Sequence, residues 1–135
     1  MNPPIVLTLL ICDHAWRDPN SGKHSLLGIF SRYANSTFPC EIDMTAYFAV
    51  TDGLGMLPIR MELIDLDEER PAVFDAEGLF RFDDRRQVID GTFACHLTIA
   101  MPGEYRLKLY VAGEFLIERS LHFVEVGAHA DADPE

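Results

Sequence analysis

Two Cys/His pairs are the side chains of this chain best suited to bind a metal. Cys12 and His14 are two residues apart in an extended segment, so they face the same side, while Cys95 and His96 are adjacent in another. Thiolate and imidazole ligands suit zinc, provided that the two segments pair. The chain has no CxxC or HExxH spacing, and cysteine usually behaves as a small buried apolar residue. Only one of Cys95 and His96 can face a core, so we expect neither a metal nor a cofactor.

A second group of candidate ligands lies in predicted turns. If consecutive strands reverse direction, every second loop lies at the same end of the fold. One pole then has the loops 16–24, 52–56, 83–87 and 112–113, and the other has 35–41, 67–71 and 100–103. The side chains that we predict as a ligand or partner site at the first pole are Trp16, Asp18, Asp52, Asp83, Asp84 and Arg85. Carboxylates suit Ca²⁺ and a tryptophan suits a sugar or a protein interface, although no Asp-x-Asp-x-Asp loop is present.

The sequence contains no arrangement typical of a catalytic site. A Gly-x-Ser-x-Gly elbow is absent, and Ser21-Gly22-Lys23 lacks both the earlier glycine and the following Ser or Thr of a phosphate-binding loop. Gly53-Leu54-Gly55 lacks the third glycine of a dinucleotide fingerprint and is interpreted as a turn. We therefore expect that the protein is not an enzyme.

The charge balance disfavours two classes of partner. The chain has 22 acidic and 11 basic side chains, a net charge of −11. Three of these negative charges belong to the segment 127–135, which we interpret as an acidic, disordered tail. Eight therefore remain on residues 1–126, which we interpret as a single β-sandwich domain. Such a field repels nucleic acid and anionic membranes. The densest basic cluster, Arg81 with Arg85 and Arg86, contains two aspartates, so we predict neither nucleic acid nor a membrane as a partner.

Cysteine usage and the N-terminus predict the compartment. Three cysteines are an odd number, which argues against a disulfide framework and favours a reducing environment. The first residues carry no basic segment of a signal peptide, and the apolar run 5–11 is too short to span a membrane. We expect a cytoplasmic protein.

The elements that must position these residues are predicted to be strands. After Pro102-Gly103, the residues Tyr105, Leu107, Leu109 and Val111 alternate with polar ones, and Ala112-Gly113 then predicts a tight hairpin turn. In the return strand, 114–126, the predicted inward residues are Phe115, Ile117, Leu121 and Phe123. Arg119 breaks this phase, which predicts a bulge or an edge position there.

The other strands are predicted at 5–15, 25–33, 42–51, 57–66, 73–82 and 88–99. Gly78 interrupts one of them as a bulge or as a hairpin turn, and in the second case every later loop changes pole. Residues 65–70 form a loop or a short helix that Pro71 ends. No helical periodicity extends over a dozen positions, so we predict an all-β protein: an antiparallel two-sheet sandwich of seven to eight strands, immunoglobulin-like or C2-like. A closed barrel is the alternative.

The chain resembles a bacterial family of small proteins with no assigned function. The resemblance is carried by Cys12-Asp13, Gly22-Lys23, Leu26-Leu27-Gly28-Ile29-Phe30, Phe38-Pro39 and Pro102-Gly103-Glu104-Tyr105. It implies a small cytosolic β-sandwich and brings no catalytic residue with it.

Two functions of different class follow from these observations. The first is a non-catalytic protein-interaction module, with the possibility of a homodimer joined through a free sheet edge or face. The alternative is a domain that binds a small ligand or Ca²⁺ through the loops of the first pole.

Overall fold

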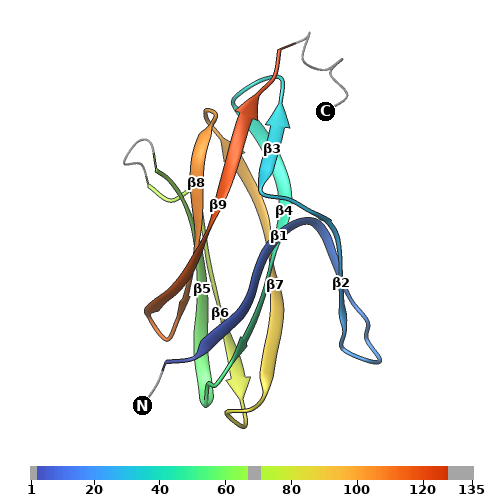
Figure 1. Cartoon of the computed structure of the whole chain (residues 1–135), viewed down its shortest axis with the longest axis vertical. Helices are drawn as coiled ribbons and strands as arrows, with labels where there is room; N and C mark the ends of the chain where they lie inside the picture. Colours follow the sequence, from blue (N-terminus) through green and yellow to red (C-terminus); the bar gives the residue numbers. More distant parts are fainter. Residues whose placement is uncertain (1–2, 67–70, 128–135) are drawn as a thin grey trace.

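The computed structural model describes residues 3–66 and 71–127, and within them it contains strands and no helix (Figure 1). The nine strands of this part of the chain are β1 (Ile5–Arg17), β2 (His24–Ile29), β3 (Arg32–Asn35), β4 (Cys40–Thr51), β5 (Gly55–Asp65), β6 (Phe74–Phe82), β7 (Val88–Ile99), β8 (Gly103–Val111) and β9 (Glu114–Glu125). The all-β class predicted from the alternating pattern is confirmed.

The strands form two sheets, with the orders β2-β1-β4-β7 and β3-β9-β8-β5-β6. The prediction of seven to eight strands was wrong by one, because the expected strand 25–33 is divided at Phe30 and Ser31. At this point the Phe30 amide donates to the Ile11 carbonyl, while the Ser31 carbonyl accepts from the His122 amide. The first bond belongs to one sheet and the second to the other, so the chain changes sheets between β2 and β3.

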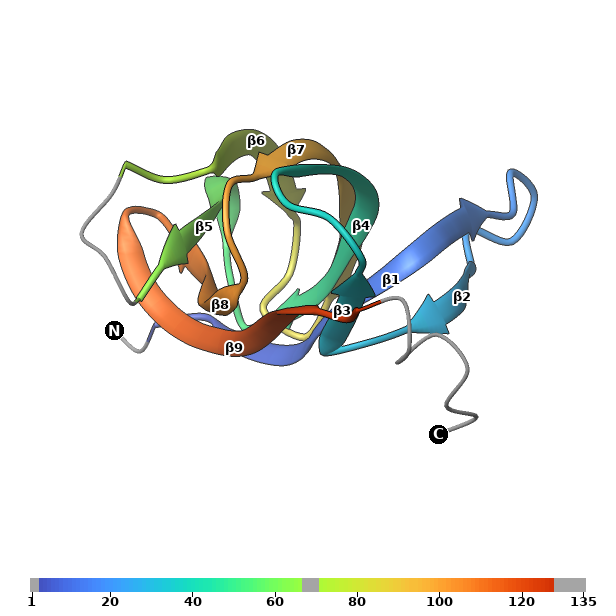
Figure 2. The same ribbon diagram turned by 90° about the horizontal axis from the view of Figure 1, so that it is seen from above.

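One strand pair is parallel, which corrects the expectation of purely antiparallel sheets. β3 pairs parallel with β9, from Arg32 opposite His122 to Asn35 opposite Glu125. Figure 1 shows the physical reason: the chain keeps its direction from β2 into β3, so it meets β9 running the same way. The sheets also curl around the core when they are seen from above (Figure 2). The immunoglobulin-like or C2-like arrangement therefore stays a prediction.

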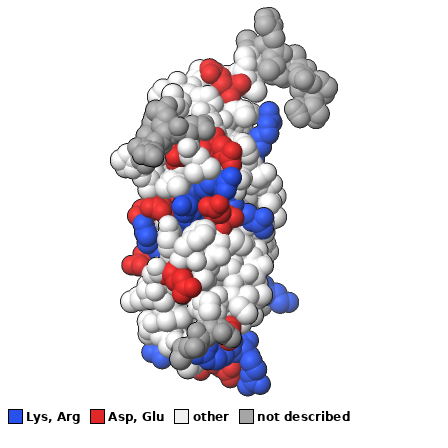
Figure 3. All heavy atoms as spheres, turned by 60° about the vertical axis from the view of Figure 1, so that its left-hand side comes forward, with Lys and Arg blue, Asp and Glu red and all other residues white. Residues whose placement is uncertain are grey.

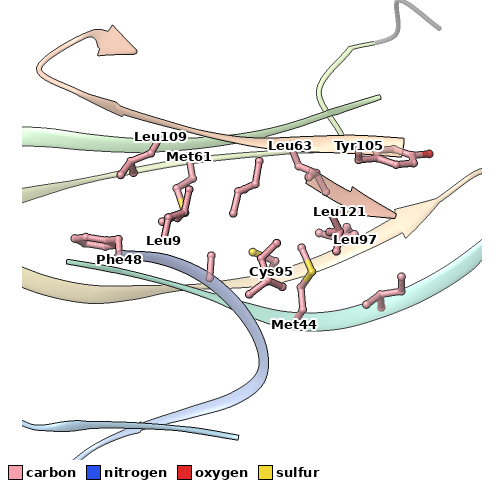
Figure 4. Packing of buried hydrophobic residues seen from close by; sticks show 14 of the residues in the cluster. Leu9, Met44, Phe48, Met61, Leu63, Cys95, Leu97, Tyr105, Leu109 and Leu121 are labelled. Atoms are coloured by element: carbon pink, nitrogen blue, oxygen red, sulfur yellow. The ribbon is translucent and has the colours of Figure 1, made fainter. Parts of the chain in front are cut away.

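The core lies between the two sheets, where apolar side chains point inward from both (Figure 4). β4 and β7 supply side chains such as Phe48, Met44 and Leu97, and β5 and β8 supply Met61 and Leu109 from the opposite side. In β8 the alternation is as predicted, because its residues at 105, 107, 109 and 111 are all buried. Period-two alternation thus determines which face of each strand enters the core.

The irregularity in β9 lies earlier than predicted. The register between β8 and β9 shifts near Leu116, which places Phe115 opposite Tyr110 on the outer face, where Phe115 is 47% exposed. Phe115 was therefore wrongly predicted as an inward residue. Arg119 is in phase instead, opposite the buried Leu107. Its side chain reaches from β9 to β1 of the other sheet, where Nε donates to the Leu9 carbonyl over 2.9 Å.

Gly78 does not form a hairpin. β6 continues through it in unbroken register with β5, with Gly78 opposite Ile59. The later loops therefore keep the poles that were predicted for them. The question of a loop or a helix at 65–70 falls largely on residues 67–70, which lie outside the described residues, as does most of the predicted loop 67–71 of the second pole. The predicted tail, 127–135, lies outside them too except for Gly127.

The outer face of the sheet that contains β5 and β8 has charges of both signs side by side (Figure 3). Arg60 makes two hydrogen bonds to the Asp75 carboxylate and one to Glu62, and Arg106 contacts both Glu104 and Glu118 at 2.7 Å. In these networks the arginines of this face are hydrogen-bonded to carboxylates of the same face.

Candidate functional site

The feature that stands apart from the body is the β1–β2 hairpin, residues 12–29. Residues 5–11 of β1 pair only with β4, whereas pairing with β2 begins at Cys12 opposite Ile29 and continues to Arg17 opposite His24. Beyond Cys12 the hairpin leaves the body and projects from it (Figures 1 and 2). It therefore offers surfaces that the packed sheets do not.

A close approach inside the hairpin explains one of its glycines. Gly28 has a φ of 72°, which favours glycine, and a Cβ at this position would lie 2.3 Å from Oδ2 of Asp13. Only a residue without a side chain fits this backbone beside the carboxylate. The Asp13–Gly28 contact thus shapes the hairpin where it leaves the body.

The turn of the hairpin is held by Asp18. Its backbone amide donates to the Lys23 carbonyl, and its carboxylate accepts from the Asn20 amide at 3.1 Å and the Ser21 hydroxyl at 2.8 Å. The Asn20 amide, followed by the Ser21 hydroxyl, lowers the pKa of Asp18. Asp18, a predicted ligand residue, therefore acts in its own turn as a capping carboxylate.

The hairpin is attached to the body through a buried histidine. Nδ1 of His24 lies 2.9 Å from Oδ2 of Asp90 in β7, and the Tyr47 hydroxyl of β4 donates to the same oxygen over 2.8 Å. The His24 side chain is 7% exposed and its ring packs 5.3 Å from that of Tyr47. Burial, and then the bond to Asp90, raises the pKa of Tyr47 to about 12. We call His24, Tyr47 and Asp90 the latch.

The opposite face of the hairpin is apolar and open. Trp16 is 56% exposed, Leu27 55% and Ile29 58%, and His14 stands opposite Leu27 and beside the Trp16 ring. β2, the outer strand, contains no Asp, Glu, Lys or Arg. Across the whole hairpin two aspartates balance one arginine and one lysine, so the net charge of −11 arises elsewhere.

The predicted first pole is assembled in part. The loops 52–54, 83–87 and 112–113 meet there, since the Asp52 amide donates to the Arg85 carbonyl and both residues line one pocket with Ala112. Trp16 and Asp18, however, lie on the projecting hairpin, because β1 parts from β4 after Cys12. The grouping of Trp16 and Asp18 with the other three loops is therefore corrected.

Each aspartate of this pole has an arginine as its partner. Asp52 lies 3.7 Å from Arg85, Asp84 lies 3.2 Å from Arg86, and Asp83 lies 3.9 Å from Arg81. The hydrogen bonds from Arg86 lower the pKa of Asp84. Within residues 3–66 and 71–127, no group of three or more His, Cys, Asp or Glu side chains is placed to hold a metal ion. The calcium alternative has no geometric support here.

The cysteines and their neighbouring histidines do not converge either. Cys12 and Cys95 are buried free thiols, and burial raises the pKa of Cys95 to about 12. His96, next in the chain, is on the outer surface, where it contacts the Asp43 carboxylate across the strand pair and lies 3.5 Å from Glu41. One residue of the 95–96 pair therefore faces the core and the other does not, as the alternation requires.

Comparison with known families agrees with the resemblance noted in the sequence. A family of unknown function, DUF6941, matches residues 7–124, which is most of the chain. The chain belongs to the DUF6941 family. No curated protein matches it. The bacterial origin and the motif pattern that we associated with the resemblance stay predictions.

In this DUF6941 protein, the residues that carry the sequence resemblance shape turns, the hairpin and the core. Asp13 and Gly28 face each other in the hairpin, Gly22 has a φ of 75° in its turn, and Tyr105 is buried with its hydroxyl donating to the Met101 carbonyl. The Phe38–Pro39 peptide bond is cis. These residues specify the fold rather than a chemical site.

Sequence reasoning did not find the latch, but it did group the three loops that supply Asp52, Arg85 and Ala112 to the pocket. Tyr47 and Asp90 lie 43 residues apart in the paired strands β4 and β7, and His24 reaches them only because the hairpin bends back. The lining residues that this grouping missed are Pro4, which precedes β1, and Leu57, which lies in β5. The described part of the chain also has no helix that is long and apolar enough to cross a membrane.

Proposed function

We propose that this DUF6941 protein is a non-catalytic protein-interaction module that binds its partner through the β1–β2 hairpin. The observation that carries this proposal is the free edge of β2, which is uncharged and flanked by exposed Trp16, Leu27 and Ile29. Edge strands of soluble proteins are usually shortened, charged or covered, because an open edge accepts another strand.

The other sheet edges have such protection. β6 and β7 lie against each other, with the Phe80 and Phe93 rings 6.5 Å apart. β3 has only four residues and begins with an exposed arginine, Arg32. The edge of β1 that faces β9 is covered by the Arg119 side chain, which donates a hydrogen bond to the Leu9 carbonyl. β2 is the edge that lacks these devices among the described strands.

Strand addition to β2 is the binding mode that suits this edge. A partner strand would hydrogen-bond to the backbone of 24–29, and its alternate side chains would meet Leu27 and Ile29 on the exposed face. Trp16 supplies a large aromatic side chain beside them, the type that dominates binding energy at interfaces.

A second copy of the chain is the partner that we propose to test first. The hairpin is electrically neutral, so two copies approach there without the repulsion that a net charge of −11 causes elsewhere. A two-fold axis at Leu27 would place Leu27 opposite its own copy and Ser25 opposite Ile29, which keeps the apolar faces of both hairpins together.

The predicted cytoplasmic location belongs to this proposal. Its support is that Cys12, Cys40 and Cys95 are buried free thiols, an arrangement that a reducing compartment preserves.

The test compares Leu27→Lys with Leu79→Lys, since Leu79 is also an exposed strand leucine, 66% exposed, but lies on β6. We expect the wild-type chain to exceed the monomer mass in light scattering at rising concentration, Leu27→Lys to be a monomer, and Leu79→Lys to behave as wild type. If the wild-type chain is strictly monomeric, a pull-down in which wild type retains a protein that Leu27→Lys loses supports a different partner at the same edge. A monomer that retains no Leu27-dependent partner contradicts the proposal.

A further inference from the structure

We propose that the pocket at the first pole binds a free α-amino acid with an apolar side chain. This site lies at the ends of β4, β6 and β8, apart from the hairpin, and it does not depend on the proposed protein interaction. Its lining consists of Pro4, Asp52, Gly53, Leu54, Leu57, Arg85 and Ala112.

The pocket has the size and the lining of a site for an apolar side chain. Its volume is about 250 Å³, and four of its residues, Pro4, Leu54, Leu57 and Ala112, present aliphatic carbon. Because an enclosed apolar cavity of about 150 Å³ is enough to hold benzene, this pocket has room for a leucine or phenylalanine side chain. Leu54, 52% exposed, lies at the surface end of the lining.

One cation and one anion stand together in this otherwise apolar lining. Nη1 of Arg85 lies 3.7 Å from Oδ1 of Asp52, too far for a hydrogen bond between the side chains, and 3.4 Å from the Asp52 carbonyl. A ligand carboxylate matches the guanidinium, and a ligand ammonium matches the carboxylate. A zwitterion pairs with both Arg85 and Asp52, whereas a simple anion is repelled by the Asp52 carboxylate and a simple cation by the Arg85 guanidinium.

The backbone around the pocket adds an independent observation. Asp52 has a φ of 65° and Ala112 a φ of 53°; among the described residues these are the two non-glycine positions with positive φ, and both line the pocket. An L-residue held in this region is strained, and such strain gathers where a structure serves a ligand. At 112 the turn type favours Asn or Gly, yet the chain has a methyl group that contributes to the lining.

The loops are held in place before any ligand arrives. The Asp52 amide donates to the Arg85 carbonyl, the Thr51 hydroxyl donates to the Gln87 carbonyl over 2.8 Å, and the Ala112 amide donates to the Pro58 carbonyl. The loops 52–54 and 83–87 are therefore fixed to each other and the 112–113 turn is fixed to β5, which lowers the ordering cost of binding.

The test uses ¹⁵N-labelled full-length chain titrated with L-leucine and L-phenylalanine. We expect shifts confined to the amides of residues 52–54, 85 and 112–113. Leucinamide, which lacks the carboxylate, and 4-methylpentanoate, which lacks the ammonium, should each bind at least roughly tenfold more weakly, since each loses a charge-assisted hydrogen bond.

Arg85→Gln should weaken L-leucine binding by a similar factor, while Arg86→Gln, next in the chain but outside the lining, should leave it unchanged. If Arg85→Gln does not fold, Leu54→Glu replaces it, because an exposed carboxylate at the pocket would repel that of the ligand. No shift with either amino acid, shifts elsewhere in the chain, or binding of leucinamide or 4-methylpentanoate as tight as that of L-leucine would overturn the proposal.

Discussion

At the scale of single residues, the contact between Gly28 and Asp13 yields a sharp prediction. Gly28→Ala should lower the free energy of unfolding by roughly 3 kcal/mol, from the positive φ and from the 2.3 Å approach to the Asp13 carboxylate. Urea denaturation measures this loss.

The matched control is Gly113→Ala, where φ is 80° but a Cβ meets nothing within 4 Å. It should cost only about 1 to 2 kcal/mol, the conformational part. In an Asp13→Ala background the cost of Gly28→Ala should fall toward that of Gly113→Ala. Equal costs for the two alanine variants in the wild-type background would contradict the steric argument.

His96 predicts a pH effect at the surface. The contact with Asp43, and then Glu41, raises its pKa above the ordinary value of about 6.5. A histidine whose pKa is raised by folding stabilises the native state below the unfolded pKa, and this contribution is lost as the pH rises through the folded pKa. An NMR titration should give a lower pKa for His96 in Asp43→Asn than in wild type. An unchanged pKa in the variant would rule out the role of Asp43.

At the scale of elements, the latch decides how the β1–β2 hairpin sits on the body. Asp90→Ala leaves both the Tyr47 hydroxyl and the His24 ring without their acceptor, which we expect to cost about 1 to 3 kcal/mol of unfolding free energy. Because the bonds join β2 to β4 and β7, hydrogen exchange should quicken in β2 and stay unchanged in β8.

Tyr47→Phe is the control for the latch, since it removes one of the two bonds and keeps the ring that packs on His24. It should cost less than Asp90→Ala and leave the exchange of β2 close to that of wild type. Slower or unchanged exchange of β2 in Asp90→Ala would show that the hairpin is held by other contacts.

At the scale of the whole molecule, Arg119 joins the two sheets, because it lies on β9 of one sheet and bonds to β1 of the other. Arg119→Ala removes the bond to the Leu9 carbonyl and should lower the unfolding free energy by about 1 kcal/mol. Arg86→Ala is the control, because the Arg86 side chain is 91% exposed and pairs only with nearby Asp84; it should change stability by less than about 0.5 kcal/mol. Thermal or urea unfolding measures the free energy of unfolding of the two variants. An equal loss in both would contradict the proposed role of Arg119 as a bridge between the sheets.

What the sequence determined by itself is local. The alternation in β8 and the Ala112-Gly113 turn predicted a hairpin that the structure contains, because side-chain period and positive φ are properties of a few adjacent residues. The same reasoning predicted that only one of Cys95 and His96 faces the core, and the structure shows that it is Cys95.

Only the tertiary structure decided the path of the chain between sheets. No local pattern shows that residues 25–33 divide at Phe30 and Ser31 or that β3 joins β9 in parallel. Nor does one show that β1 parts from β4 and separates Trp16 and Asp18 from Asp52. The latch depends on this path, because His24 lies on the hairpin while Tyr47 and Asp90 lie on the body. Strand pairing between distant segments is a property of the whole chain, since each pairing is chosen by the burial that all the others leave available.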